Sequence, residues 1–403
     1  MTESVSAPRR GRLMSVDTLR GLVMIVMALD HVRDFIHRGA MSGASPTDLA
    51  TTAPMLFLTR WVTHFCAPVF MLTAGLGARF YLRNGERTKG QLSRFLVTRG
   101  AWLIVLELTV MQLAYDFNLS TANPIFLLVL YVLGACMVVL AGLIWVPVPL
   151  LAAVSVATIV MHNALDPIRA QSFGDNAWLW TLLHQVGALP VAGRIVIAPY
   201  TLIPWFAVMA GGFCLGSLFS MASARRERLL FRIGVVMTMA FLLVRAANVY
   251  GDPSRWSWES SATLTVLSFL NTTKYPPSLS FLLMTLGPAL IVLSRFDRVQ
   301  FSRSNPLIVF GRVPLFYFVV HFIAAHAAIV LLSLMTYGTS ALSFMFQPVP
   351  SMGGPAKAFP ADFGYDLWVA YAVWITIVIA LYPLCAWFAR VKERSSHWSL
   401  SYL

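Results

Sequence analysis

Long apolar runs separated by short polar segments dominate the chain. A helix that crosses the hydrocarbon core of a membrane needs about 20 mostly apolar residues. Ten segments meet this requirement: 14–37, 54–82, 92–115, 124–145, 147–164, 199–221, 229–250, 277–295, 306–335 and 367–389. The pattern predicts an all-α polytopic membrane protein with about ten transmembrane helices.

Composition supports the same class. Of 403 residues, 58% are hydrophobic and only 12% are charged, whereas soluble domains have about 25% charged residues. The net charge of +13 comes from arginines and lysines that gather in alternate loops, at 9–12, 83–89, 225–228, 295–303 and 390–394. The positive-inside rule then places both termini in the cytoplasm. Membrane topology therefore explains the basic balance, and no nucleic-acid partner is expected.

The chain divides simply. We expect a basic cytoplasmic tail at 1–13, a single multispan membrane domain at 14–390 and a second cytoplasmic tail at 391–403. Four cysteines lie in apolar runs without a CxxC pair, so neither a disulfide framework nor a zinc site is indicated. The histidines show no HxxxH or HxH spacing, and no metal is expected.

The first apolar segment carries an unusual number of ionisable residues. A 3-4-3-4-3 spacing places four of them on a single helical face together with two methionines: Asp17, Arg20, Met24, Met27, His31 and Asp34. Each ionisable group at membrane depth costs roughly 2.5–3.5 kcal/mol, so this face should point into the protein. A structural Asp17–Arg20 salt bridge and a buried structural His31 are the alternative interpretations.

Other segments add charges at two depths. His31, His64 and His321 fall at mid-depth or slightly towards the outer side, while Arg20, Arg99 and Arg312 fall towards the cytoplasm. Imidazoles can carry protons or an acyl group near neutral pH, and arginines suit phosphates. Each arginine alone is also typical of a snorkelling or topology residue.

Several blocks carry a family resemblance. "RLMSVDTLRGLVMIVMALDH", "FLTRWVTHFCAPVFMLTAG", "KYPPSLSF" and "NPLIVFGRVPLFYFVVH" resemble the heparan-alpha-glucosaminide N-acetyltransferase-like membrane proteins, especially bacterial ones, within the acyltransferase-3-like superfamily. The resemblance implies acetyl-CoA binding from the cytosol, transfer to an amine or hydroxyl acceptor at the far side, and location in a bacterial inner membrane.

The resemblance also assigns residues. His31 matches the histidine that the superfamily is taken to use in catalysis, and His321 matches the last histidine of the ninth-helix block. In the lysosomal enzymes an asparagine stands at the position of His31, and their key histidine follows in the first luminal loop, where only His37 is available. Their aspartate before "PxF" is replaced by His64. A covalent acetyl-histidine and direct transfer with histidine as base both stay open.

These arguments give one leading hypothesis, an acyl-CoA-dependent acyltransferase acting on a saccharide or another small acceptor. A proton-coupled transporter that uses the same histidines is the alternative, a purely structural subunit explains the buried charges poorly, and a homodimer stays open. Asp34, on the face of His31, is expected to orient that ring, because Asp30 points about 100° away. The candidate sites are catalytic His31, His64, His321 and Asp34; cofactor-binding Arg20, Arg99, Arg312 and Arg60; and substrate-binding Lys274, Tyr275 and Glu107.

Overall fold

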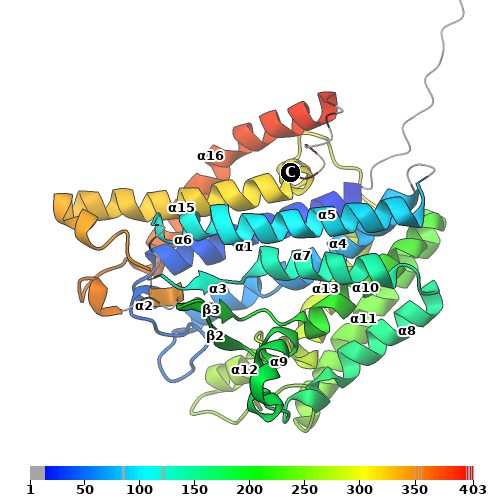
Figure 1. Ribbon diagram of the computed structural model, residues 1–403, viewed down its shortest axis with the longest axis horizontal. Coiled ribbons are helices and arrows are strands. Elements are labelled where there is room, and N and C mark those ends of the chain that lie inside the picture. Colours follow the sequence, from blue (N-terminus) through cyan, green and yellow to red (C-terminus); the bar gives the residue numbers. More distant parts are fainter. Residues whose placement is uncertain are drawn as a thin grey trace, which may run out of the picture.

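Helices make up nearly the whole of the computed structural model (Figure 1). It describes residues 14–83, 87–118, 120, 123–348, 350–352, 354, 356–395, 397, 400 and 402. The predicted basic tail at 1–13 lies outside the described residues. The prediction of an all-α polytopic membrane protein is confirmed, and the orientation of the termini stays a prediction.

Eight helical stretches in the described part of the chain are long and apolar enough to cross a membrane. They are Pro54–Leu82, Lys89–Asp116, Val148–Leu165, Leu202–Ser220, Ser223–Ala247, Leu279–Phe296, Pro314–Ser343 and Leu367–Arg394. Helices α1 (Met14–Ile36) and α7 (Val129–Leu143) occupy the other two predicted segments. These two helices differ from the eight because α1 carries several charged residues and α7 has only 15 residues.

The spanning stretches contain the principal helices. These are α3 (Pro54–Thr63), α4 (Cys66–Arg83), α5 (Lys89–Leu106), the π-helix η1 (Glu107–Met111), α6 (Gln112–Asp116), α8 (Val148–Met161), α10 (Leu202–Leu215), α11 (Ser223–Ala247), α13 (Leu279–Phe296), α15 (Pro314–Tyr337) and α16 (Leu367–Arg394). Helix α14 (Pro306–Arg312) directly precedes the stretch that starts at Pro314.

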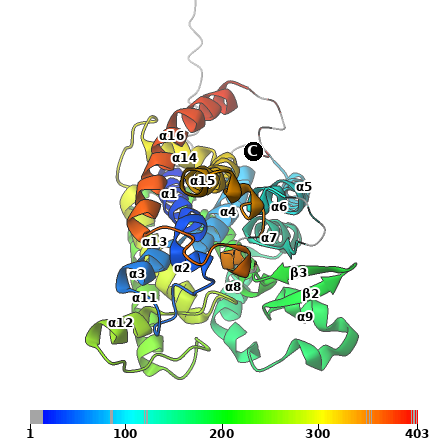
Figure 2. The ribbon, with the colours of Figure 1, turned by 90° about the vertical axis from the view of Figure 1, so that its left-hand side faces the viewer.

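Shorter elements connect them. They are α2 (Arg38–Met41), α9 (Ala177–Leu183), α12 (Ala262–Leu270), and the 3₁₀ turns η2 (His162–Leu165), η3 (Ala170–Asn176), η4 (Gly216–Ser220), η5 (Gly338–Ser343), η6 (Pro350–Met352) and η7 (Ala356–Ala358). A small sheet has the order β1 (Ile125–Phe126), β3 (Arg194–Ala198), β2 (Gly187–Val191). Strand β3 runs parallel to β1 and antiparallel to β2, and Figure 2 shows this sheet beside α9 at one flank of the bundle.

Two segments predicted as single helices are each divided in two. Helix α3 ends at Thr63 and α4 starts at Cys66, because Pro68 has no backbone N–H for the carbonyl of His64. Helix α14 ends at Arg312, and Val313 adopts φ −127° and ψ 48° before Pro314 begins α15. A residue that precedes proline is driven out of the helical region. The prolines therefore place a helix break on either side of the site described below.

Helix α1 lies at the centre of the bundle. It packs against α3, α4, α13, α14, α15 and α16, and Figure 2 shows it surrounded by these helices. Glycines bring the backbones together: a Cβ on Gly21 would lie 1.7 Å from the carbonyl oxygen of Leu307, and one on Gly311 would lie 1.8 Å from that of Asp17. Small residues allow such close contact between membrane helices. The polar face of α1 is thus held inside the protein, as its spacing predicts.

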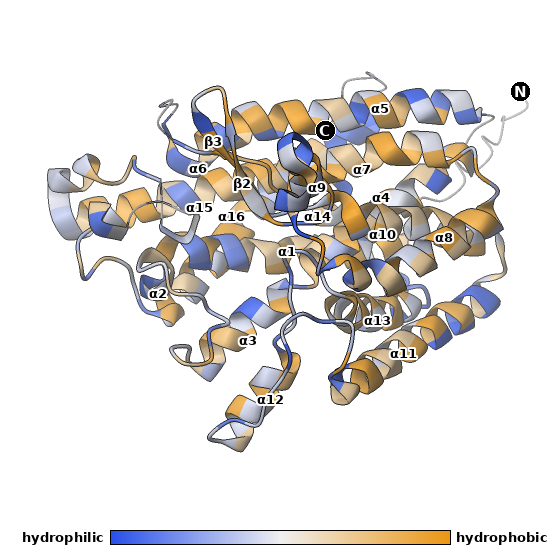
Figure 3. Cartoon of the chain, turned by 60° about the horizontal axis from the view of Figure 1, so that its bottom comes forward, coloured by the Kyte–Doolittle hydropathy of each residue, from blue (hydrophilic) through white to orange (hydrophobic). Residues whose placement is uncertain are grey.

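The outer helices face lipid. In α8, α11 and α16 only 22% of the most apolar window is buried inside the protein. Figure 3 shows mostly apolar residues along α8, α10 and α11, with polar residues gathered at one end of α11, where the helix begins with SARRER. Apolar side chains exposed over this length need a hydrocarbon environment.

Candidate active site

Two histidines from distant helices form the centre of the site. The Nδ1 atom of His31 on α1 lies 2.8 Å from Nε2 of His321 on α15. The two rings are nearly parallel, with an interplanar angle of 8°. The Nδ1 atom of His321 lies 2.7 Å from the carbonyl oxygen of Tyr317. The structure therefore joins two of the three histidines that the sequence selects.

This chain of hydrogen bonds fixes the tautomers of both rings. The Tyr317 carbonyl only accepts, so Nδ1 of His321 carries the proton and its Nε2 is an acceptor. Nδ1 of His31 must then donate to that acceptor, which leaves the lone pair on Nε2 of His31. Among the described residues this Nε2 has no hydrogen-bond partner. It is not one of the unpaired atoms that are fully buried, so part of its surface is accessible. His31 thus presents a neutral basic nitrogen.

Aromatic residues of α15 hold the His31 ring. Phe318 and Phe322 meet it edge-on, with ring centroids 5.9 Å and 4.7 Å away. The expectation that Asp34 orients His31 is wrong. Asp34 instead accepts a hydrogen bond of 2.7 Å from its neighbour Arg33, and the bond that orients His31 comes from His321.

An ion network lies beside His31, between residues 30–34 of α1 and Arg60 of α3. Oδ1 of Asp30 accepts from Arg33 at 2.9 Å, and Oδ2 of Asp30 is bound by Arg60 of α3. Sequence reasoning assigned no role to Asp30 or Arg33, although their i, i+3 spacing is typical of an ion pair. Arg60 was predicted to bind the cofactor. Its partner Asp30 lies ten residues from Arg20, about 15 Å along α1, so Arg60 belongs to the opposite end of the site.

His64 lies near this network and outside the histidine pair. It caps the end of α3, is 3% exposed, and packs against the ring of Phe281 at 5.4 Å. Its Nδ1 atom is buried without a hydrogen-bond partner. Arg60 and Lys274 are within electrostatic range of it. In the part of the chain that the structure describes, no hydrogen bond or ring contact joins His64 to His31 or His321.

Lys274 and Tyr275 lie in the loop before α13. The Lys274 ammonium is 5.1 Å from the centre of the Tyr275 ring, and Tyr275 bonds to Tyr200, whose ring is 5.2 Å away. Partial burial opposes ionisation of Tyr275, but the charges of Lys274 and Arg60 outweigh it and lower the pKa of this phenol. These predicted acceptor residues therefore lie beside the ion network, within electrostatic range of Asp30.

A cavity of about 820 Å³ lies between α1, α4, α5, α7 and α15. Asp17, Arg20, Arg87 and Arg99 supply its charged lining, and most of the remaining lining is apolar. Arg20 and Arg99 are thus brought together as predicted, and Arg87 is a further cation that sequence reasoning missed. Arg87 follows α4 in a polar loop, where nothing distinguished it from topology residues.

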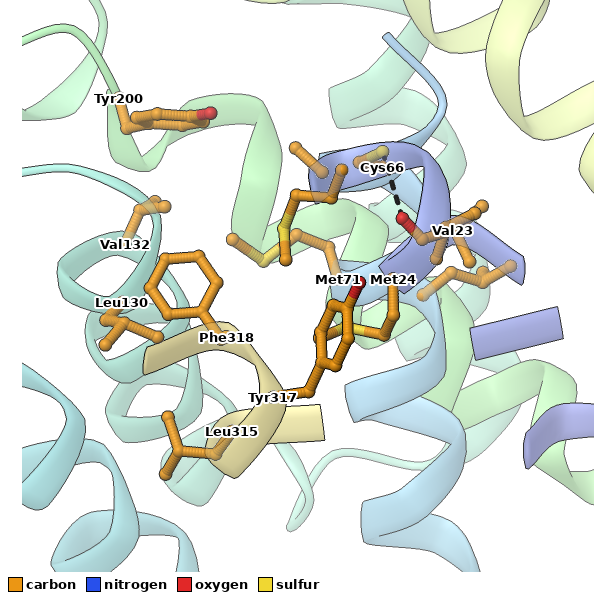
Figure 4. Packing of buried hydrophobic residues seen from close by; sticks show 14 of the residues in the cluster. Val23, Met24, Cys66, Met71, Leu130, Val132, Tyr200, Leu315, Tyr317 and Phe318 are labelled. Carbon is orange, nitrogen blue, oxygen red and sulfur yellow. Dashed lines mark hydrogen bonds between the residues drawn. The ribbon is translucent and has the colours of Figure 1, made fainter. Parts of the chain in front are cut away.

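The cavity reaches the neighbourhood of the histidine pair. Phe318 belongs to its lining and also contacts His31. Figure 4 shows Phe318 beside Leu130 and Val132 of α7, with Tyr317 beside Met24 of α1. His31 and His321 themselves are not among the lining residues, so Phe318 stands between the cavity and the histidines.

Arg312 and Glu107 correct two predictions. Arg312 is not part of the cavity lining, and it forms an ion pair of 2.6 Å with Glu393 of α16. Glu107 is fully buried and accepts hydrogen bonds from the backbone N–H groups of Leu130 and Tyr131, at 2.8 Å and 3.2 Å. It satisfies the start of α7, where helical N–H groups otherwise have no partner. Glu107 is therefore a capping residue.

Four other histidines make hydrogen bonds outside the His31–His321 pair. His162 bonds to the carbonyls of Ile159 and Pro277, His184 to Asp166, and His326 to the carbonyl of Ala114. His37 accepts from the N–H of Gly39 and caps α2. Within the described residues, no group of three histidine, cysteine or acidic side chains is arranged to hold a metal ion.

Sequence comparison gives one family match. A family model described as "Heparan-alpha-glucosaminide N-acetyltransferase, catalytic" matches residues 12–251. The matched region contains His31, His64, Arg60 and Arg99, while Lys274 and His321 lie beyond it. No curated protein sequence matches the chain.

Proposed function

The chain belongs to the heparan-alpha-glucosaminide N-acetyltransferase family, and we propose from this premise that it moves an acetyl group from acetyl-CoA to an amine or hydroxyl acceptor. The donor enters the Arg20–Arg99 cavity from the cytosol, and the acceptor reaches His31 from the outer side. The location we propose is the inner membrane of a bacterium. The basic nitrogen of His31, held by His321 next to a cavity lined with arginines, is the observation that carries the proposal.

The cavity suits a phosphorylated donor. Arg20, Arg87 and Arg99 offer guanidinium groups, which bind phosphates through charge-assisted hydrogen bonds. Two of these cations, Arg20 and Arg99, lie within electrostatic range of one another, an arrangement that an anion relieves. The apolar lining that continues to Phe318 suits the less polar arm that carries a thioester. Asp17, 3.3 Å from Arg20, holds that guanidinium at the cavity wall.

The histidine pair suits proton transfer. In the proposed step the acceptor nitrogen or oxygen attacks the thioester carbonyl, and its proton passes to Nε2 of His31. The carbon–sulfur bond then breaks, and the proton on Nε2 passes to the leaving thiolate. His321 keeps Nδ1 of His31 protonated throughout, so the ring always presents Nε2 to the reaction. The same lone pair would also serve as nucleophile if a covalent acetyl-histidine formed.

The test is mass spectrometry of the detergent-purified protein with isotope-labelled acetyl-CoA and a panel of amino sugars. We expect labelled acetylated acceptor, and we expect His31→Ala to abolish it while acetyl-CoA binding is retained. A labelled adduct on the intact protein in the absence of acceptor indicates the covalent route. His37→Ala tests the other histidine at this end of α1 and should retain transfer. If no acceptor is acetylated while protons cross liposomes that contain the protein, the transporter hypothesis replaces this one.

A further inference from the structure

In the ion network beside His31, both carboxylates are already paired with guanidinium groups. Both oxygens of Asp30 are bound, one by Arg33 and the other by Arg60. Asp34 is bound by the same Arg33 at 2.7 Å. Two carboxylates therefore balance two guanidinium groups, and the network leaves no carboxylate charge for a further cation.

Lys274 is that further cation. Among the described residues no carboxylate lies within 4.0 Å of its ammonium group, and its contacts are with Tyr275. The acidic residue bound to this loop, Asp252, is already engaged. It accepts from the N–H and hydroxyl of Thr273, at 3.1 Å and 2.8 Å, and faces Arg245 at 3.9 Å.

A cation in this place is costly without an anion. Lys274 is half-buried, and a charge that leaves water needs a paired charge or hydrogen-bonding groups to offset the loss. Three cationic side chains, Arg33, Arg60 and Lys274, stand against the two carboxylates of the network. The excess is one positive charge, and Lys274 is within electrostatic range of His31.

The loop is also open to an incoming molecule. Tyr275 keeps 36% of its surface exposed, and its phenol is tied to Tyr200. The lysine thus stands at an accessible edge of the site, and the base of the proposed reaction lies further inside. A molecule that binds Lys274 at one end can present its amine or hydroxyl to Nε2 of His31 at the other.

We propose that Lys274, assisted by the Tyr275 phenol, binds an anionic group of the acceptor, a carboxylate or a phosphate. The acceptor class is then an amino sugar or amino alcohol that carries negative charge. This inference rests on the proposed acetyltransferase function and adds to it the charge of the acceptor.

The experiment measures kcat/KM for three acceptors with the purified protein and acetyl-CoA. Glucosamine is the neutral acceptor, glucosamine 6-phosphate carries a phosphate, and muramic acid carries a carboxylate. We expect the wild-type protein to favour one or both anionic acceptors, and the preferred one identifies the anion. Lys274→Gln should lower kcat/KM for the anionic acceptors by about 10- to 150-fold, the effect of losing a hydrogen bond to a charged group. The loss for glucosamine should be clearly smaller, because glucosamine has no anionic group for Lys274 to bind.

Two further variants complete the design. Lys274→Arg keeps the charge and should recover most of the preference for the anionic acceptor. Lys357→Gln removes one positive charge from an exposed position of η7 and should change nothing. A wild-type preference for glucosamine, or an equal loss for all three acceptors in Lys274→Gln, overturns the inference while the acetyltransferase function stands. Failure to acetylate any of the three acceptors counts against both.

Discussion

The hydrogen bond between His31 and His321 yields a quantitative prediction. Replacing His321 with phenylalanine keeps a ring in this fully buried position but removes the acceptor for Nδ1–H of His31. Replacing it with glutamine places an amide oxygen near the former Nε2, which can still accept that bond. Glutamine cannot take up a proton, so the pair of variants separates the orienting role of His321 from a role in carrying protons.

The magnitude follows from the tautomers. In His321→Phe the productive tautomer of His31 leaves a buried N–H without a partner, at a cost of about 1–3 kcal/mol. The ring avoids this cost by moving the proton to Nε2, and that tautomer has no lone pair to offer the acceptor. The population of the active form, and with it kcat, should fall by about 5- to 150-fold. His321→Gln should retain most of the activity.

The assay is acetyl transfer at saturating donor and acceptor, with acetyl-CoA binding as the check on folding. His326→Gln is the matched control, because His326 is also fully buried on α15 and its ring bonds to the Ala114 carbonyl, away from His31. Wild-type kcat in His321→Phe would refute the tautomer argument. An equal loss in His321→Gln and His321→Phe would show that His321 must itself be protonated during the reaction.

Three further predictions concern the donor cavity, the packing of α1 and the topology. Arg99→Ala should weaken acetyl-CoA binding by about 10- to 150-fold. Arg312 lies outside the cavity, so Arg312→Ala should leave the Kd for acetyl-CoA unchanged. Equal effects of the two variants would contradict the cavity assignment. Gly21→Ala should lower the Tm in detergent, since its Cβ would lie 1.7 Å from the Leu307 carbonyl oxygen. Such overpacking typically costs about 1–3 kcal/mol of stability. Gly142→Ala is the control and should leave the Tm unchanged, because the space around its Cβ is open. A cysteine at exposed Arg225 should react with impermeant reagents only from the cytoplasmic face, and labelling from outside would invert the proposed topology.

Much of the fold was predictable because long apolar runs decide where membrane helices form. Each of the ten predicted segments contains a helix. The breaks at His64 and Val313 were not predictable from the same signal. Pro68 and Pro314 mark these positions, but a proline in a membrane helix can bend it or end it. Neighbouring helices decide between the two outcomes.

The site was predictable only in part. The spacing on α1 placed His31 inward, but its partner is 290 residues away and is brought to it by helix packing at glycines. Asp34 shares the helical face of His31, yet its carboxylate is bound by the adjacent Arg33 and does not bond to His31. Glu107 was expected to bind substrate, but it accepts from the backbone N–H groups of Leu130 and Tyr131, which lie 23 and 24 positions further along the chain. This contact joins two helices, so the pattern of residues within either helix does not reveal it.

Phe318 offers the last test, because it separates the two halves of the proposed reaction. It lines the donor cavity, and its ring centroid lies 5.9 Å from that of His31 and 5.8 Å from that of His321. Neither histidine lines the cavity, so we expect a thioester in the cavity to reach Nε2 of His31 past this side chain. A smaller residue should widen the passage for water as well as for the acyl group.

Phe318→Leu should therefore raise hydrolysis of acetyl-CoA in the absence of acceptor, relative to acetyl transfer in its presence, and should admit longer acyl groups. Leucine is preferable to alanine, because Phe→Ala in a core costs about 3–5 kcal/mol of stability. Phe316→Leu is the control on the same helix, since Phe316 stacks on Phe388 at 4.4 Å and is not part of the cavity lining. A ratio of hydrolysis to transfer that is the same in both variants would show that the acyl group reaches His31 by a route that avoids Phe318, and the donor cavity would then have to be sought elsewhere around α1.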